Sequence, residues 1–278
     1  MKKLCSTEEK GDVAQLVRVL DWQSRGRGFE SHLLHKKKFY LLFITQTMRF
    51  ITYIIILFSF SLFGQEKNQL DYLYPNSDLV IDYHDEWGSQ HYKKRINIFK
   101  KNPLSANDVV FLGNSITEGG KNWNDRLNYP QIKNRGISGD VTDGVLARLD
   151  EIIYFKPKMV FLLIGINDLW NTSLNIPSTE YIGDNIIKIA KTIKKKSPQT
   201  LIYIQTILPI HKENFKPKIE RINKIIYDYK ENNLYQVIDL FSVFSNKNGL
   251  MNDEYTTDGV HLNEKGYNVW VKTIKPLF

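Results

Sequence analysis

Over residues 109–274, continuous apolar runs alternate with segments in which apolar residues recur every three or four positions. An apolar run bounded by turn residues is typical of a strand buried on both faces of a parallel sheet, and the longer spacing is typical of an amphipathic helix. Five such runs predict strands, at Val109–Leu112, about Ile132–Ile137, Met159–Gly165, Leu201–Leu208 and Gln236–Leu240.

The helical spacing falls before and between these runs. It predicts helices at about Ser89–Lys101, Val145–Ile153, Thr179–Lys195 and Lys216–Glu231, and a last helix from near Asn263. Strands alternating with helices predict an α/β fold, a three-layer α/β/α sandwich around a parallel sheet. Its crossover connections should be right-handed.

Polar residues follow three of the predicted strands. These segments are Gly113-Asn114-Ser115, Ser138-Gly139-Asp140 and Gly165-Ile166-Asn167-Asp168, and Asp258 and His261 lie just before the last helix. In open parallel sheets, ligands bind beyond the carboxyl ends of the strands. We therefore expect these residues to meet at one edge of the sheet.

The residue types gathered there are those that acyl transfer needs. A serine hydroxyl such as that of Ser115 needs a neighbouring base, and His261 can supply an imidazole. A carboxylate, here Asp258, fixes the tautomer and orientation of the imidazole. The N–H groups of Ser115 and Gly139 and the side-chain amide of Asn167 can form an oxyanion hole.

Each of these residues also has a structural interpretation. Asp258 can cap the last helix beside a surface histidine, and Gly139 and Asn167 can be simple turn residues. Asp140 and Asp168 are expected to brace loops. His84, His91 and His211 show no metal-ligand spacing and are expected at the surface, with His211 at the rim of the pocket.

Three further residues are candidates for substrate binding, namely Asn114, Trp123 and Trp170. Both tryptophans lie on the expected catalytic side of the sheet. They can stack on the face of a sugar or pack the loops, and the sequence does not distinguish these roles.

Four segments of the chain resemble the SGNH (GDSL-type) hydrolase family, in the family's order. They are Gly113-Asn114-Ser115-Ile116-Thr117-Glu118, Asn134–Asp140, Gly165–Asp168 and Asp258–Asn263. The resemblance implies a flavodoxin-like sheet of five parallel strands and ester hydrolysis through an acyl-serine, with no metal and no organic cofactor. Asn114 replaces the family's aspartate, as in acetylesterase and platelet-activating-factor acetylhydrolase-like members. No Gly-x-Ser-x-Gly motif surrounds Ser115.

The first 107 residues divide into three segments. Within residues 1–47, the segment Gly11–His35 resembles the peptide obtained when a bacterial transfer-RNA gene is read through as protein. This indicates a start site assigned too early, and a basic, disordered leader is the alternative. Residues 48–64 have the layout of a signal peptide starting at Met48, with cleavage after Gly64. Export is the expectation, and a membrane anchor over residues 39–63 is the alternative. Residues 65–107 are expected to wrap the hydrolase domain at 108–278.

The charge distribution argues against nucleic-acid binding, and the cysteine content excludes an intrachain disulfide. The net charge of +8 is concentrated at the start, because residues 1–64 hold 10 Lys/Arg and 5 Asp/Glu and the remainder holds 28 and 25. The mildly basic domain gives no indication of nucleic-acid binding. Cys5 is the only cysteine, so an intrachain disulfide is excluded.

The sequence therefore predicts an exported serine esterase that removes short acyl groups, acetyl above all, from carbohydrates. One alternative is a lysophospholipase or thioesterase with the same triad. The other is a non-catalytic carbohydrate-binding protein on the same fold. The expected partner is a small-molecule or carbohydrate ester, and the oligomeric state is left open.

Overall fold

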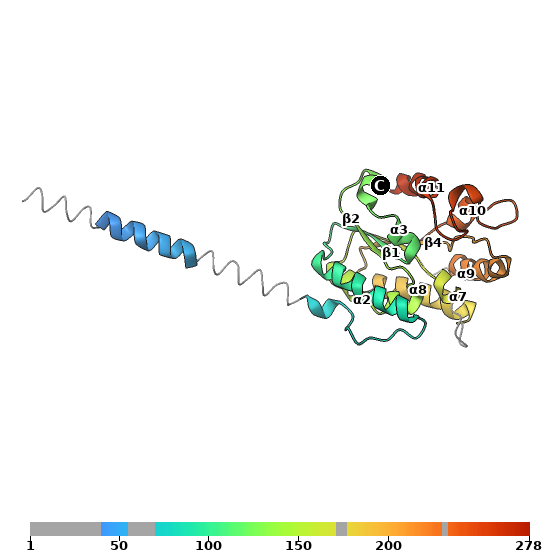
Figure 1. The fold of residues 1–278 in the computed structure, drawn as a ribbon, viewed down its shortest axis with the longest axis horizontal. Helices are drawn as coiled ribbons and strands as arrows, with labels where there is room; N and C mark the ends of the chain where they lie inside the picture. Colours follow the sequence, from blue (N-terminus) through green and yellow to red (C-terminus); the bar gives the residue numbers. More distant parts are fainter. Residues whose placement is uncertain (1–39, 55–69, 171–176, 230–232) are drawn as a thin grey trace, which may run out of the picture. The chain divides into compact units, whose positions relative to one another are not determined.

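The computed structural model describes residues 40–54, 70–170, 177–229 and 233–278 (Figure 1). Compactness divides the chain into Met1–Gln69 and Leu70–Phe278. In the first unit, residues 40–54 form a helix whose side chains are exposed, and the rest of the predicted signal peptide lies outside the described residues. Among the described residues, no helix is long and apolar enough to cross a membrane.

The second unit contains a sheet of five parallel strands. They are β1 (Val109–Gly113), β2 (Ile132–Gly136), β3 (Met159–Leu163), β4 (Leu201–Gln205) and β5 (Gln236–Ile238). The strand order is β2-β1-β3-β4-β5, and every pair is parallel. The predicted α/β fold with a five-stranded parallel sheet is confirmed.

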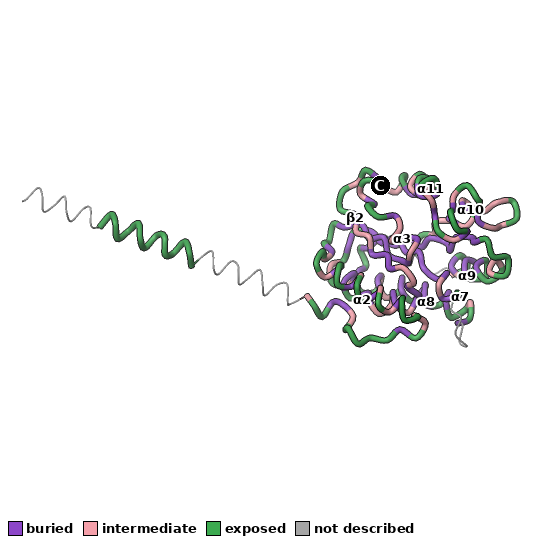
Figure 2. The backbone as a smooth tube through the Cα atoms, viewed as in Figure 1, coloured by how far each residue is buried: buried purple, intermediate pink, exposed green. Residues whose placement is uncertain are grey.

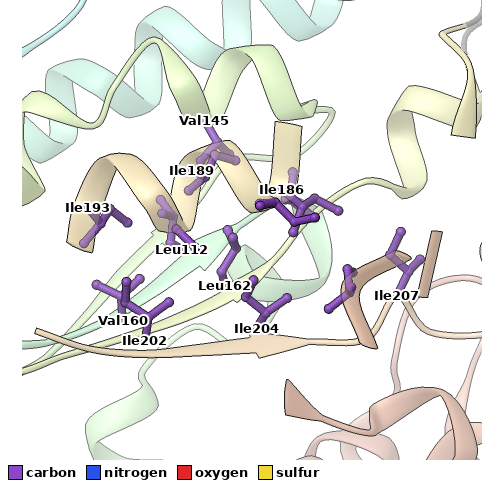
Figure 3. Packing of buried hydrophobic residues seen from close by; sticks show 14 of the residues in the cluster. Leu112, Val145, Val160, Leu162, Ile186, Ile189, Ile193, Ile202, Ile204 and Ile207 are labelled. Atoms are coloured by element: carbon purple, nitrogen blue, oxygen red, sulfur yellow. The ribbon is translucent and has the colours of Figure 1, made fainter. Parts of the chain in front are cut away.

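The apolar strands contribute buried side chains to both faces of the sheet, because successive side chains point to opposite sides. One set, including Leu112, Leu162 and Ile204, packs against α5 (Thr142–Leu146), α6 (Asp150–Phe155), α8 (Thr179–Lys196) and α9 (Lys216–Asp228) (Figure 3). Each large aliphatic side chain buried there contributes about 1.5–3 kcal/mol.

The other set, including Phe111 and Phe161, packs beneath a second group of helices. These are α4 (Trp123–Leu127), α10 (Leu240–Phe244) and α11 (Glu264–Ile274). The buried stretches in Figure 2 accordingly run through the strands, while exposed positions lie on the outer helix faces. This arrangement is the predicted three-layer sandwich.

Helix α2 (Glu86–Lys101) and the short 3-10 helix η1 (Asp71–Leu73) form a third cluster with Ile137. Tyr92, Ile96 and Phe99 are the buried positions of α2, as their helical spacing predicts. Asp85 caps the start of this helix, because its carboxylate accepts a hydrogen bond from the Gly88 N–H at 2.6 Å. Residues 70–107 therefore pack on the domain.

The remaining elements are short. They are α3 (Ser115–Gly119), α7 (Ile166–Trp170), η2 (Glu213–Phe215), η3 (Asp253–Tyr255) and η4 (Lys275–Leu277). The one predicted helix at Val145–Ile153 was wrong, because two helices, α5 and α6, occupy that region. Between them, Arg148 turns inward and donates hydrogen bonds to the Asp140 carboxylate and the Gly113 carbonyl.

Candidate active site

Ser115 begins α3 directly beyond the end of β1. Asn114 caps this helix, because its side-chain oxygen accepts a hydrogen bond from the Ile116 N–H at 3.1 Å. The hydroxyl of Ser115 is thereby placed at the carboxyl edge of the sheet, as the sequence predicts.

A hydrogen-bonded chain joins Ser115 to the loop before α11. His261 Nε2 lies 3.0 Å from Ser115 Oγ, and His261 Nδ1 lies 2.7 Å from Asp258 Oδ2. The other carboxylate oxygen of Asp258 accepts the N–H groups of Val260 and His261 at 2.9 and 2.7 Å. A single tight turn therefore holds both the imidazole and its carboxylate.

This turn needs glycine at its second position. Gly259 has φ +83°, and a Cβ there would lie 2.6 Å from Nδ1 of His211. A side chain at position 259 would both strain the backbone and displace the His211 ring.

Asp258 is held as a carboxylate. Partial burial raises its pKa, but hydrogen bonds from the His261 side chain and from the backbone N–H groups of His261 and Val260 outweigh burial. The pKa of Asp258 is lowered to about 2. The group is thus ionised at neutral pH and available to orient His261.

Three potential donors belong to residues that line the same cavity as Ser115 Oγ. The N–H groups of Ser115 and Gly139 have no hydrogen-bond acceptor among the described residues, and Gly139 is turned by its φ of +80°. The Asn167 side-chain amide donates one of its two hydrogens to the Asp140 carbonyl at 2.9 Å, which leaves the other free. Unpaired donors of this kind can stabilise an oxyanion.

These residues surround a cavity of about 630 Å³. Ser115, Gly139, Asn167, Asp258 and His261 all line it, so the structure brings together the residues predicted for the triad and the oxyanion hole. The other lining residues are Trp87, Ser138, Trp170, His211, Lys212, Gly259 and Val260. The cavity provides a volume beside Ser115 in which a small molecule can bind.

Two of the three predicted substrate-binding residues do not line the cavity. Trp123 is 1% exposed, because it stacks on Phe111 and donates its indole N–H to the Thr117 carbonyl. Asn114 is also buried, in its capping role. Both assignments to substrate binding were wrong, whereas Trp170 lines the cavity and is partly exposed.

Sequence reasoning missed the cavity wall supplied by α2. Trp87 is 58% exposed, lines the cavity and stacks on His91 with ring centroids 4.9 Å apart. Its position near the start of an amphipathic helix, off the buried stripe, was the available signal. Lys212 was also missed, and His211 lies at the pocket as expected.

The loop that carries Gly139 is fastened to α3 through Glu118. The Glu118 carboxylate accepts hydrogen bonds from the Ser138 N–H and hydroxyl at 2.6 and 2.8 Å, and His91 Nε2 lies 2.9 Å away. Burial raises the pKa of Glu118, but the bonds from His91 and Ser138 lower it below its usual range. This anchoring fixes the segment that carries Gly139 relative to α3, which Ser115 begins.

Asp140 and Asp168 are buried and brace loops, as predicted. Asp140 is bound by the Arg148 guanidinium, and His84 Nε2 lies 3.2 Å from its carboxylate. The side chain of His84 is 1% exposed, so its predicted surface location was wrong. Asp168 accepts the N–H and hydroxyl of Thr142, and burial nevertheless raises the pKa of Asp168 to about 6.

Comparison with known proteins agrees with this fold. Residues 111–269 match the GDSL-like lipase/acylhydrolase family. A GDSL-like lipase from Bacteroides thetaiotaomicron VPI-5482 superposes with a TM-score of 0.58 at 26% identity, over 67% of this chain and 96% of that one. A mutant acetyl-xylooligosaccharide esterase from Geobacillus Stearmophilus, at 19% identity and a TM-score of 0.52, shares the fold over 62% of this chain and 93% of its own.

One curated relative matches most of this chain but is itself a longer protein. The N-acylneuraminate cytidylyltransferase of Escherichia coli O18:K1:H7 (strain RS218 / NMEC) is 27% identical over an alignment of 190 residues that covers 65% of this chain. The match spans only 42% of that relative's length.

An α/β/α fold with a Ser-His-Asp hydrogen-bond chain at the carboxyl edge of its sheet defines the class of the protein as a hydrolase of the SGNH type. The chain belongs to the GDSL-like lipase/acylhydrolase family, and it is an ester-hydrolysing enzyme.

Proposed function

We propose that this chain is an exported serine esterase that removes short acyl groups, acetyl above all, from carbohydrates through an acyl-serine at Ser115. The observation that carries the proposal is the chain of two hydrogen bonds from Ser115 through His261 to Asp258, at 3.0 and 2.7 Å. It opens into a cavity large enough for a substituted sugar.

The geometry supports the steps of acyl transfer. His261 Nε2 takes the proton of Ser115 Oγ as the oxygen attacks the ester carbonyl. His261 then returns that proton to the leaving alkoxide, and an acyl-serine remains. His261 then takes a proton from a water molecule, which attacks the acyl group. As the bond to Ser115 Oγ breaks, His261 returns that proton to Oγ, and the acid is released. Asp258 holds the imidazole and stabilises its cationic form throughout.

Charge develops on the carbonyl oxygen in each tetrahedral intermediate. The N–H groups of Ser115 and Gly139 and the free amide hydrogen of Asn167 are proposed to bind that oxygen. Loss of one such donor typically costs about 10²–10³ in rate. The anchoring of Asn167 by the Asp140 carbonyl preorganises its amide for this role.

Two partly exposed indoles support a carbohydrate substrate. Trp87 and Trp170 both line the cavity, and flat aromatic faces suit the C–H face of a sugar ring. The Escherichia coli relative is named for action on an N-acylneuraminate, which is a sugar, and this supports the same substrate class. Its cytidylyl transfer is not part of the proposal for this chain.

The test is hydrolysis of p-nitrophenyl acetate by the wild type, Ser115→Ala and Ser105→Ala. The Ser115 variant should lose at least about 10³-fold in kcat, because the nucleophile is gone. Ser105 is exposed in a turn away from the cavity, so its variant should match the wild type. Equal rates for Ser115→Ala and wild type would refute the mechanism.

Two alternatives have their own readouts. A lysophospholipase or thioesterase would prefer acyl chains of eight or more carbons in a series of esters or thioesters. A non-catalytic carbohydrate-binding protein would leave Ser115 unlabelled by a fluorophosphonate in the folded protein. Lys121 and Asn122 are polar residues that follow Ser115, but neither lines the cavity, so the chain-length series decides between short and long acyl groups.

Export through a signal peptide starting at Met48, with the domain boundaries predicted at residues 47, 64 and 107, is part of the same proposal. Mass analysis of the mature N-terminus tests it. A terminus at Gln65 supports cleavage after Gly64, and a terminus that retains residues 39–63 supports the anchored form.

A further inference from the structure

The charged side chains that line the cavity are not equally neutralised. Asp258 is paired with His261, and His211 Nε2 lies 3.0 Å from the Met251 carbonyl and 2.9 Å from Asp253. Lys212 also lines the cavity, yet it forms no ion pair within the described parts of the chain. It is therefore a cationic group on the cavity wall that no carboxylate of these parts neutralises.

Aromatic rings hold this ammonium group. Lys212 Nζ lies 3.9 Å from the centre of the Trp170 ring and 5.8 Å from that of Phe215. A cation–π contact restrains the position of an ammonium but leaves its charge available. Three other lysines in this half of the domain do have carboxylate partners, in the pairs Lys216–Glu220, Lys224–Asp228 and Lys265–Glu254.

The segment that carries Lys212 is fixed to the catalytic turn. The His211 N–H donates to the Gly259 carbonyl at 3.0 Å, and the His211 ring packs on Gly259. Gly259 lies inside the turn that holds Asp258 and His261. The ammonium of Lys212 is thus tied by its neighbour to the same wall of the cavity as the general base.

We propose that Lys212, restrained by Trp170, is a subsite for a carboxylate on the substrate, so that the preferred esters are those of acidic sugars. The inference rests on the proposed function, because it concerns the ester that Ser115 attacks. The sugar ring packs against the exposed indole of Trp87, and its carboxylate meets the ammonium of Lys212. A lysine ammonium is a compact point charge, which can pair with a singly charged carboxylate.

The test compares an O-acetylated methyl glucuronoside with its uncharged carboxamide, which has the same shape. Acetate release is measured at low ionic strength for the wild type, Lys212→Met, Lys212→Arg and Lys218→Met. Methionine keeps an apolar stem against Trp170 and removes only the charge. Lys218 is the matched control, because its ammonium lies 5.9 Å from the Phe215 ring but does not line the cavity.

The wild type should favour the carboxylate substrate in kcat/KM by roughly fivefold, the upper range for a solvent-accessible ion pair. Lys212→Met should abolish this preference, and Lys212→Arg and Lys218→Met should retain it. Added salt should reduce it, because the pair is screened. Equal rates on both substrates in the wild type, or a preference that survives in Lys212→Met, would overturn the proposal.

Binding separates this inference from the catalytic proposal. Calorimetric titration of Ser115→Ala with the two unacetylated glycosides does not require turnover. Tighter binding of the carboxylate, lost in the Ser115→Ala/Lys212→Met double variant, supports the subsite even if Ser115 proves not to be the nucleophile. Equal binding, or no binding of either glycoside, overturns the subsite while leaving Ser115-dependent hydrolysis of p-nitrophenyl acetate intact.

Discussion

Asp258 has two functions that a single substitution can separate. Its Oδ2 orients His261, and its Oδ1 closes the turn by accepting two backbone N–H groups. An asparagine keeps one acceptor oxygen but has no negative charge. This substitution should therefore change both the orientation of the imidazole and the pH dependence of the stability of the fold.

Asp258→Asn should lower kcat by about 10³–10⁴-fold, because the imidazole loses its fixed tautomer. Its effect on stability depends on pH. The pKa of Asp258 is about 2 in the folded chain, below its value of about 3.8 when unperturbed, so the ionised carboxylate stabilises the fold above pH 4. That stabilisation is lost as the pH falls from 4 towards 2.

Urea unfolding of the wild type and Asp258→Asn at pH 5 and pH 2.5 measures this change. The difference in unfolding free energy between the two proteins should shrink at the lower pH. A difference that stays constant would show that the charge of Asp258 contributes nothing to stability.

The meeting of Ser115, Asp258 and His261 was predictable from residue types and strand ends, because the three residues lie in short turns next to well-defined elements. The substrate-binding predictions for Trp123 and Trp170 had different outcomes, for a reason that the sequence does not contain. Trp123 lies on a five-residue helix that turns its indole onto Phe111, whereas Trp170 lies at the end of α7 beside the cavity. The direction of a short helix is set by tertiary packing.

At the scale of elements, the strands were predictable because buried parallel strands are apolar throughout. Helix α8 was predictable for a related reason, since its isoleucines recur on one face. The break between α5 and α6 was not, because it depends on Arg148 reaching Asp140 and Gly113. The side-chain spacing of Val145, Leu149 and Ile152 is the same with or without that break.

A buried ion pair joins α6 to β2, and its carboxylate also contacts residues 70–107. Glu151 and Arg135 are about 4–5% exposed and form two hydrogen bonds of 2.9 and 2.6 Å. The same carboxylate accepts the Tyr74 hydroxyl and the Leu104 N–H. Four donors thus depend on one side chain.

Glu151→Ala should destabilise the fold by about 3–5 kcal/mol, because it leaves the Arg135 guanidinium buried without its counter-ion. Chemical denaturation measures the loss. Asp228→Ala is the control, since it removes the exposed partner of Lys224 and should cost less than about 1 kcal/mol. Equal losses in the two variants would contradict a structural role for the buried pair.

At the scale of the whole molecule, the working enzyme extends beyond the segment that matches the family. That segment begins at residue 111, yet Trp87 of α2 forms part of the cavity and His91 contacts Glu118. Residues 70–107 also bury Tyr92, Ile96 and Phe99. The sequence indicated that this segment wraps the domain but not that it supplies part of the site.

Two truncations test this extension. A chain of residues 70–278 should fold and keep the wild-type rate on p-nitrophenyl acetate, because it comprises the whole second unit. A chain of residues 108–278 should be destabilised and lose most of its activity, because the Glu151 contacts to Tyr74 and Leu104 and the Trp87 wall are removed. Circular dichroism melting and the esterase assay measure both. A fully active 108–278 chain would refute the role of α2.

The hydrogen bond between Ser115 and His261 joins residues 146 positions apart. Contacts between residues so distant in sequence form late in folding. Most of the intervening chain must be ordered before the segments that carry Ser115 and His261 can meet. If Ser115 and His261 act as proposed, a polypeptide still emerging from the ribosome, whose nucleophile is made before its base, cannot hydrolyse esters. We therefore expect catalytic activity to report on the integrity of the domain from the first strand to the last helix.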